Sequence, residues 1–327
     1  MIRDPGPAAA GSSVAAASPA GLRRRSRVLD QLAHRAVAAA AAVNVLVVLL
    51  LVVFLALRAA PGLKSIGLGT FFGSADWQPD AGIGFGGVGA FGALAPILGS
   101  FTVVVLALVI AVPFAMAVAV VLVETNPRLG ERFIRPAVEV FVGIPSVVYG
   151  YLGFIALLPL LRHLAPPGRD GSGVLAAAVV LAIMVIPTVA SISADGLLSI
   201  PAALREGSLA LGATRWQTIR RVLLPAARPS IVSGVVLGFA RAMGEALAVA
   251  LVIGDVNVIP DVRARGLQAL LEPFTTMTVT ITDGVDKLAI NPDGTAARYM
   301  LALVLLIVTF LSIVVVRMVT RRGEPTR

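Results

Sequence analysis

The sequence contains no cysteine, and among its 327 residues it has only two histidines and two lysines. Without cysteine the chain forms no disulfide, no thiolate metal site and no cysteine nucleophile. His34 and His163 are too few for a histidine metal cluster, and both are expected beside arginines at membrane boundaries. Neither Lys64 nor Lys287 follows a G-x-x-x-x-G-K-[ST] pattern, so the chain has no P-loop. We expect no metal, no cofactor and no catalytic site of its own; any ATP would be bound by another chain.

Charged residues are also scarce, at 14%, whereas 57% of the residues are hydrophobic. Soluble domains lie nearer ~45–50% apolar residues, and the mean hydropathy here is +0.92. Such a chain needs hydrocarbon as part of its solvent. The net charge of +9 is explained by arginines flanking membrane segments, so no nucleic-acid partner is expected.

Six apolar runs are long enough to cross the ~30 Å of hydrocarbon, which takes ~20 residues as a helix. They cover residues 36–57, 99–123, 139–161, 174–192, 231–253 and 299–316. The first run is too long for the ~7–15-residue core of a signal peptide, so it is expected to be retained. The sequence therefore predicts an all-α polytopic membrane protein with six transmembrane helices.

The distribution of lysine and arginine predicts the orientation of these helices. With the N-terminus inside, the cytoplasmic segments hold 18 of these residues and the outer segments hold 8. Positive residues are enriched on the cytoplasmic side, which places both termini inside. We expect a disordered basic tail over 1–35, a membrane domain over 36–317 and a cytoplasmic tail over 318–327.

The longest cytoplasmic segment, 193–230, has the signals of two short helices. Pro201 suits a first helical turn and Gly212 a helix stop. Thr214 with Gln217 fits a capping box that opens the second helix. We expect Pro225 to end that helix, and four apolar side chains to share one face of it: Trp216, Ile219, Val222 and Leu223. On this pattern alone, a helix pair that merely anchors the loop at the membrane surface is an equal alternative.

The spacing of this segment resembles the EAA motif of ABC import permeases, which runs Glu-Ala-Ala, three residues, Gly, nine residues, Ile-x-Leu-Pro. Small residues replace the alanines, and valine replaces the isoleucine. The resemblance implies the type I (MetI-like) importer permease fold and a loop that docks on a cytoplasmic ATPase. The residues it assigns to this coupling are Glu206, Gly207, Gly212, Ala213, Leu224 and Pro225.

Two charges interrupt the fifth apolar run, Arg241 and Glu245. A charge at the centre of a span costs ~2.5–3.5 kcal/mol on insertion scales. Their i, i+4 spacing predicts an ion pair on one helix face, and Gly234, Gly238 and Ala242 predict close approach of another helix. A pair that only locks helices is one alternative. The other is an anion site on the substrate path, because guanidinium matches tetrahedral oxyanions.

Two further segments resemble the permeases of bacterial phosphate importers: 143–150 at the start of the third run and 238–249 around Arg241. The first holds Pro145, Ser146 and Tyr149, which are expected to bend the helix. Outer segments 71–79 and 91–96 resemble the PstC type of this family.

This resemblance implies ATP-driven import of inorganic phosphate across the cytoplasmic membrane. The implied partners are a PstA-type permease, two ATPase subunits that hold ATP and Mg²⁺, a periplasmic or lipid-anchored phosphate-binding protein, and membrane lipid. Two alternatives are an ABC permease for another oxyanion (molybdate, tungstate or sulfate) and a self-contained secondary transporter.

Overall fold

The computed structural model describes residues 19–79, 89–125, 128, 130–165, 168–283 and 292–323. Four described helices are long and apolar enough to cross a membrane: Ala33–Ser65, Leu94–Glu124, Val174–Leu198 and Pro292–Val315. Two further pairs of helices pass the same test together but are bent, which brings the spans to six if each pair counts as one. The described chain is helical apart from its turns and one pair of two-residue strands.

Two compact units make up the chain, 1–54 and 55–327. The first unit holds most of α1 (Pro19–Ser65). The predicted first span lies within this helix, and none of its apolar window is buried by protein, as expected of a surface that faces lipid. The expectation of disorder over 1–35 is wrong from Pro19 onward, where the chain is already helical. Residues 1–18 lie outside the described residues.

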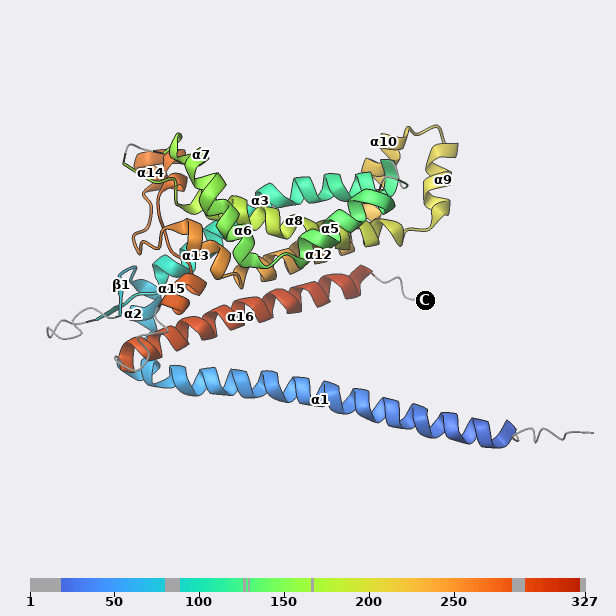
Figure 1. The fold of residues 1–327 in the computed structure, drawn as a ribbon, viewed down its shortest axis with the longest axis horizontal. Helices are drawn as coiled ribbons and strands as arrows, with labels where there is room; N and C mark the ends of the chain where they lie inside the picture. The colour runs from blue at the N-terminus through green and yellow to red at the C-terminus, as the bar shows by residue number, and fades with distance from the viewer. Residues whose placement is uncertain are drawn as a thin grey trace, which may run out of the picture. The chain divides into compact units, whose positions relative to one another are not determined.

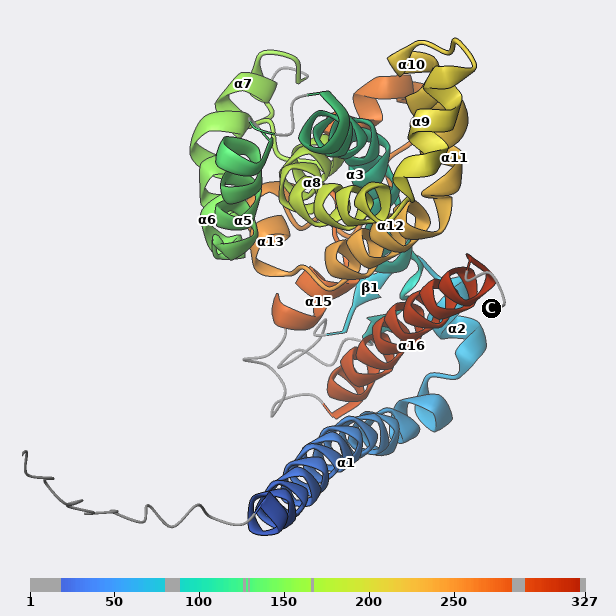
Figure 2. The ribbon, with the colours of Figure 1, turned by 90° about the vertical axis from the view of Figure 1, so that its right-hand side faces the viewer.

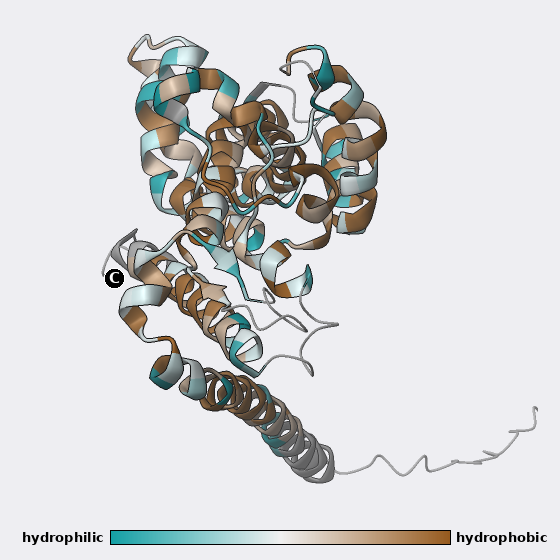
Figure 3. Ribbon diagram, turned by 90° about the vertical axis from the view of Figure 1, so that its left-hand side faces the viewer, coloured by the Kyte–Doolittle hydropathy of each residue, from teal (hydrophilic) through white to brown (hydrophobic). Residues whose placement is uncertain are grey.

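In the second unit the central helix is α8 (Val174–Leu198), which has the largest buried share of any candidate span. It packs against α3 (Leu94–Val120) and α12 (Arg228–Met243), and α12 packs in turn on α16 (Pro292–Gly323) (Figure 1). Figure 3 shows hydrophobic residues gathered along these bundle helices.

Glycines allow the predicted close approach in the fifth span. A Cβ at Gly238 would lie 2.7 Å from Val185 Cγ1 of α8, and one at Gly234 would lie 3.3 Å from the carbonyl oxygen of Val189. Ala242 on the same helix is buried. The small residues therefore bring the backbone of α12 against α8, which is how helices associate in lipid.

The third span is two helical segments joined at an angle of 95°. A π-helical turn (Gly130–Ile134) and α5 (Arg135–Gly143) precede the bend. After it come α6 (Ser146–Leu152), a π-helical turn (Gly153–Leu157) and α7 (Leu158–Arg162). The third span over 139–161 was expected to bend at Pro145, Ser146 and Tyr149, and at this point the helix is interrupted: Ile144 and Pro145 have extended backbones, because proline disfavours a helical residue before it.

The fifth span is also interrupted. After α12 ends at Met243, residues 244–246 are not helical, and α13 (Leu247–Ile253) follows. The prediction of one helix over 231–253 is therefore wrong. Before α12 the chain bends by 69° from the segment Arg215–Ala226.

The short elements lie at the two ends of the bundle (Figures 1 and 2). One end carries α9 (Ala202–Ala210) and α10 (Arg215–Thr218). The opposite end holds the remaining ones: α2 (Leu68–Gly73), β1 (Trp77–Gln78), β2 (Ala90–Phe91), α14 (Val262–Arg265), a 3₁₀ helix (Gly266–Leu271) and α15 (Met277–Asp283). Strands β1 and β2 are antiparallel, with Trp77 opposite Phe91. The predicted cytoplasmic loop is thus separated from the predicted outer segments by the length of the helices.

Candidate functional site

The predicted coupling loop forms a helix, a glycine turn and a second helix. Pro201 is the N-cap of α9, and Gly212 after its end has a φ of +83°, a left-handed conformation that glycine adopts without strain. The N–H of Ala213 donates to the carbonyl of Ser208 at 3.2 Å, which satisfies an orphan carbonyl of the helix end. This end of α9 therefore has a fixed geometry.

The capping box also forms as predicted. The N–H of Gln217 donates to Thr214 Oγ1 at 3.2 Å, and the N–H of Thr214 donates to Gln217 Oε1 at 2.9 Å. The helix continues through a π-helical turn (Ile219–Leu223) into α11 (Leu224–Ala226). The helix ends at Ala226, one residue beyond the predicted end at Pro225.

The predicted apolar face of this helix is wrong at its first member. The Trp216 side chain is 61% exposed, while Thr218, Ile219 and Leu223 are buried. The buried residues Ile219, Leu223 and Ala227 recur every four residues, and Trp216 does not lie in this series. Trp216 is left as an exposed aromatic side chain beside α9.

The residues assigned to ATPase coupling are mostly accessible. Glu206, Gly207, Gly212 and Pro225 are exposed, and Ala213 and Leu224 are half-buried. A Cβ at Gly207 or at Gly212 would meet no atom within 4 Å. These two glycines therefore leave an open surface on the helix pair, which is what a docking element for another chain requires.

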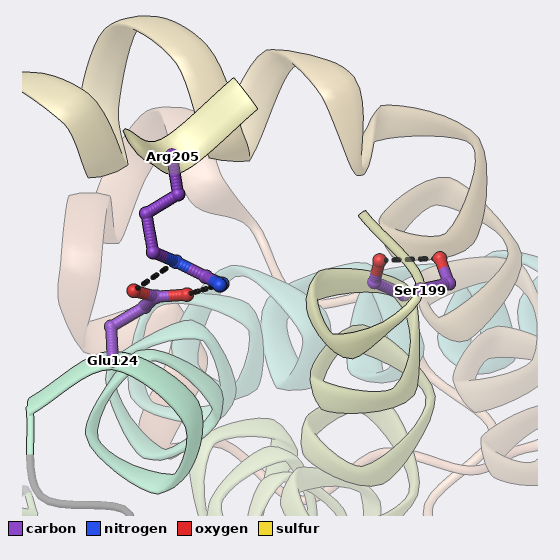
Figure 4. A network of polar contacts seen from close by, with 4 residues as sticks. Glu124, Ser199 and Arg205 are labelled. Carbon is purple, nitrogen blue, oxygen red and sulfur yellow. Dashed lines mark hydrogen bonds and ion pairs between the residues drawn. The ribbon is translucent and has the colours of Figure 1, made fainter. Parts of the chain in front are cut away.

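An ion pair that sequence reasoning missed joins this loop to the membrane helices (Figure 4). Arg205 of α9 donates from Nε to Glu124 Oε2 at 3.1 Å, and its second guanidinium nitrogen contacts Glu124 Oε1. Glu124 lies in the π-helical turn (Val121–Thr125) that extends α3, and its side chain is only 8% exposed. The partners are 81 residues apart in sequence, so no local pattern indicates the pair.

The structure separates the two charges of the fifth span. Arg241 is half-buried and donates from a guanidinium nitrogen to Thr188 Oγ1 of α8 at 2.8 Å. Glu245 lies beyond the end of α12, one residue before the N-cap Ala246 of α13, and its side chain accepts from the N–H of Ala248 in the first turn of α13 at 3.2 Å. No ion pair between them occurs among the described residues. The predicted pairing is wrong because the helix ends at Gly244, and the i, i+4 geometry needs a continuous helix.

The break in the fifth span is tied to the outer segment. The hydroxyl of Thr278 in α15 donates to the carbonyl oxygen of Glu245 at 2.7 Å. The N–H of Met277 donates to Ser100 Oγ of α3 at 2.8 Å. Helix α15 therefore reaches from the predicted outer side into the bundle and fixes the chain beside Glu245.

The bend residues of the third span lie close to α13, because α6 packs on that helix. Pro145 is the N-cap of α6, and Ser146 begins it. The buried Tyr149 hydroxyl donates to the carbonyl of Phe141 at 2.6 Å and so links α6 to α5 across the bend. A Cβ at Gly150 would lie 2.7 Å from Ala248 Cα, so α6 packs closely on α13. The two broken spans thus meet near their breaks.

The described helices form an apolar bundle with an exposed helix pair at one end. A chain of a MetNI methionine ABC transporter, solved in inward facing conformations, shares this fold: its TM-score is 0.52 at 21% identity, covering 70% of this chain and 94% of that one. Residues 111–324 match the family described as binding-protein-dependent transport system inner membrane component.

Two relatives cover nearly the whole chain. The "Probable ABC transporter permease protein YqgH" of Bacillus subtilis is 38% identical, covering 92% of this chain and 94% of its own. The "Phosphate transport system permease protein PstC" of Mesorhizobium japonicum is 34% identical, covering 91% and 92%. The chain belongs to the family of binding-protein-dependent ABC permeases. It is a multi-pass inner-membrane component of a binding-protein-dependent transport system.

Proposed function

We propose that this chain is the permease subunit through which an ATP-driven importer moves inorganic phosphate across the cytoplasmic membrane. The observation that carries the proposal is Arg241, a guanidinium held within the fifth span by Thr188. A charge within a membrane span is energetically costly, so charged residues at such positions usually have a function. The guanidinium of arginine also matches the geometry of phosphate oxygens. The similarity to a phosphate transport permease of Mesorhizobium japonicum supports the same substrate.

The chain itself makes and breaks no bond in this proposal. A PstA-type permease completes the pathway, two ATPase subunits hold ATP and Mg²⁺, and a periplasmic or lipid-anchored binding protein delivers phosphate. The exposed surface around Glu206 and Gly212 docks on the ATPase. When ATP binding closes the ATPase dimer, α9 transmits the movement to the spans through its connection with Glu124. The path then opens outward to receive phosphate, and hydrolysis resets it inward.

The proposal is tested by phosphate uptake into proteoliposomes that hold the assembled complex, with Arg241→Gln as the variant. The loss of a charge-assisted hydrogen bond, worth ~1.5–3 kcal/mol, should lower uptake at least about tenfold. Arg263→Gln is the matched control, since it removes an exposed arginine from the outer segment and should leave uptake unchanged. Normal phosphate uptake by an assembled Arg241→Gln complex would refute the role of Arg241. Faster uptake of sulfate or molybdate than of phosphate by the unaltered complex would refute the substrate.

A further inference from the structure

A polar cavity of about 280 Å³ lies at the end of the bundle that carries β1 and α15. Four segments that are distant in sequence form it: β1, the turn after α13, α15 and the beginning of α16. Its polar lining includes Gln78, Asp255, Asn257, Thr280, Asp283 and Arg298. The cavity is separate from Arg241, and none of the residues assigned to the substrate path or to the coupling loop lines it.

One cation and two carboxylates face this cavity together. Arg298 lines the cavity and is only 4% exposed, so its guanidinium is shielded from bulk solvent. Asp255 has a φ of +42°, an uncommon conformation for a residue other than glycine. Thr275 Oγ1 donates to Asp255 Oδ1 at 2.8 Å and thereby holds that carboxylate in place. Such held conformations concentrate at ligand sites.

We propose that this cavity is an outer receiving site for a protonated tetrahedral oxyanion, an inference that rests on the proposed import of phosphate. The Arg298 guanidinium donates to the oxygens of the anion. The carboxylates of Asp255 and Asp283 accept a hydrogen bond only from an oxyanion that carries a proton. Inorganic phosphate keeps at least one proton at neutral pH and sulfate keeps none, so sulfate meets the carboxylates with lone pairs alone. The site therefore selects phosphate before the anion reaches Arg241.

The position of the cavity suits an entry site. Thr280 and Asp283 of its wall belong to α15, and Thr278 of the same helix bonds the carbonyl of Glu245 at 2.7 Å. Thr275 Oγ1 also lies 3.0 Å from Thr280 Oγ1. The short helix therefore connects the wall of the outer cavity directly with the break in the fifth span.

The chain has no cysteine, so Gln78→Cys places a single thiol of this chain at the cavity. The assembled complex in proteoliposomes is treated with a membrane-impermeant maleimide, with and without phosphate. Labelling should be about tenfold slower when phosphate is about ten times its Kd, because only the empty fraction reacts. Sulfate at the same concentration should not slow it. Leu267→Cys is the control, an 83% exposed position at the same end outside the cavity, and phosphate should not protect it.

A second variant tests the selectivity. Asp255→Asn with Asp283→Asn, made in the Gln78→Cys chain, replaces both carboxylates by amides of the same shape that donate hydrogen bonds, so sulfate should now protect the thiol. The proposal is overturned if phosphate fails to protect Gln78→Cys, if sulfate protects it equally, if Leu267→Cys is protected as well, or if the double variant still excludes sulfate. Phosphate uptake by the unaltered complex separates the two proposals: uptake without protection refutes only the cavity, and protection without uptake refutes only the import.

Discussion

Arg241 obtains its orientation from a hydroxyl on a neighbouring helix. Its guanidinium nitrogen lies 2.8 Å from Thr188 Oγ1, and both side chains are half-buried. A hydrogen bond to a charged group contributes ~1.5–3 kcal/mol, and it also fixes which face of the guanidinium a passing anion meets. Thr188 is therefore a positioning residue for Arg241.

We expect Thr188→Val to lower phosphate uptake about tenfold, which corresponds to ~1.4 kcal/mol. Valine keeps the shape of threonine and removes the hydroxyl that orients the guanidinium. Thr188→Ser keeps the hydroxyl and should retain most of the uptake. Initial rates of uptake by assembled complexes measure the effect, and equal rates for the valine and serine variants would contradict it.

Glu245 combines a charge with a hydrogen bond to a helix end, and the two roles can be separated. Its Oε1 accepts from the N–H of Ala248 in the first turn of α13, an N–H that has no partner within the helix, and such a hydrogen bond contributes ~1 kcal/mol. Glu245→Gln keeps an oxygen acceptor of the same length and removes the charge. Glu245→Ala removes both the charge and the hydrogen bond.

If Glu245 acts chiefly through this hydrogen bond, Glu245→Gln should have nearly the stability and uptake of the unaltered chain. Glu245→Ala should lose ~1 kcal/mol of stability at α13. Thermal unfolding of the purified complex and phosphate uptake are the two measurements. Loss of uptake in Glu245→Gln without a change in stability would show instead that the charge itself takes part in transport.

Local sequence patterns predicted which residues belong to these sites better than they predicted the partners that those residues contact. The charges of the fifth span, the capping box and the glycine turn follow from residue types at short spacing, and all are present. The pairing of Arg241 with Glu245 assumed a continuous helix. A single glycine, Gly244, ends α12, and the partners of both charges then come from elsewhere in the chain.

At the scale of elements, α9 is fastened to α3 by the pair of Arg205 and Glu124 (Figure 4). The Glu124 side chain is 8% exposed and that of Arg205 is 32% exposed, so solvent screens the pair only weakly. Removal of one partner from a buried pair costs ~3–5 kcal/mol. Because solvent still reaches the Arg205 guanidinium, the cost of removing Glu124 is expected at the lower end of this range. In the proposed complex, these two charged groups are the contact that joins the docking surface of α9 to the end of α3.

We expect Glu124→Gln to uncouple hydrolysis from transport. The docking surface of α9 remains, so ATPase activity should persist, whereas phosphate imported per ATP hydrolysed should fall several-fold because α3 no longer follows α9. The exchange Glu124→Arg with Arg205→Glu should restore part of the ratio. Arg220→Gln, an exposed arginine of the same loop, is the control and should not change it. An unchanged ratio in Glu124→Gln would show that α9 acts through other contacts.

The bends explain why the sequence predicted the presence of each membrane-spanning segment better than the residues at which its helices begin and end. Hydropathy is summed over about twenty residues, so it finds each apolar run but not an interruption within it. Ile144 and Pro145 bend the third span by 95°, and Trp216 is exposed rather than part of the buried face of its helix. Pro145 indicates a bend in the third span, but no local pattern predicts its angle of 95° or the exposure of Trp216.

Across the whole molecule, some apolar helix surfaces are buried by other helices and others are left uncovered. The window of α8 that could span a membrane is 61% buried, whereas that of α1 is 0% buried. Val140, Val147 and Val148, on either side of the bend in the third span, are also exposed. Uncovered apolar faces of this kind suit contact with lipid and, in the proposed complex, with the second permease.

The orientation of the molecule can be tested by labelling because the chain has no cysteine. Leu211→Cys lies in the turn after α9 at a 91% exposed position, and Leu267→Cys lies in the 3₁₀ helix at the other end. With both termini inside, a membrane-impermeant maleimide should label Leu267→Cys in spheroplasts, whose cytoplasmic membrane is intact. It should label Leu211→Cys only after the membrane is opened or inverted. The unaltered chain should not react.

The expected asymmetry has a physical cause in the positive charges. The predicted cytoplasmic segments hold 18 lysines and arginines against 8 outside, and such residues are retained on the cytoplasmic side during insertion. An odd number of spans would instead bring the two termini to opposite sides of the membrane. Labelling of Leu211→Cys from outside would therefore contradict both the six-span topology and the docking of α9 on a cytoplasmic ATPase, since that surface could not meet an ATP-binding chain.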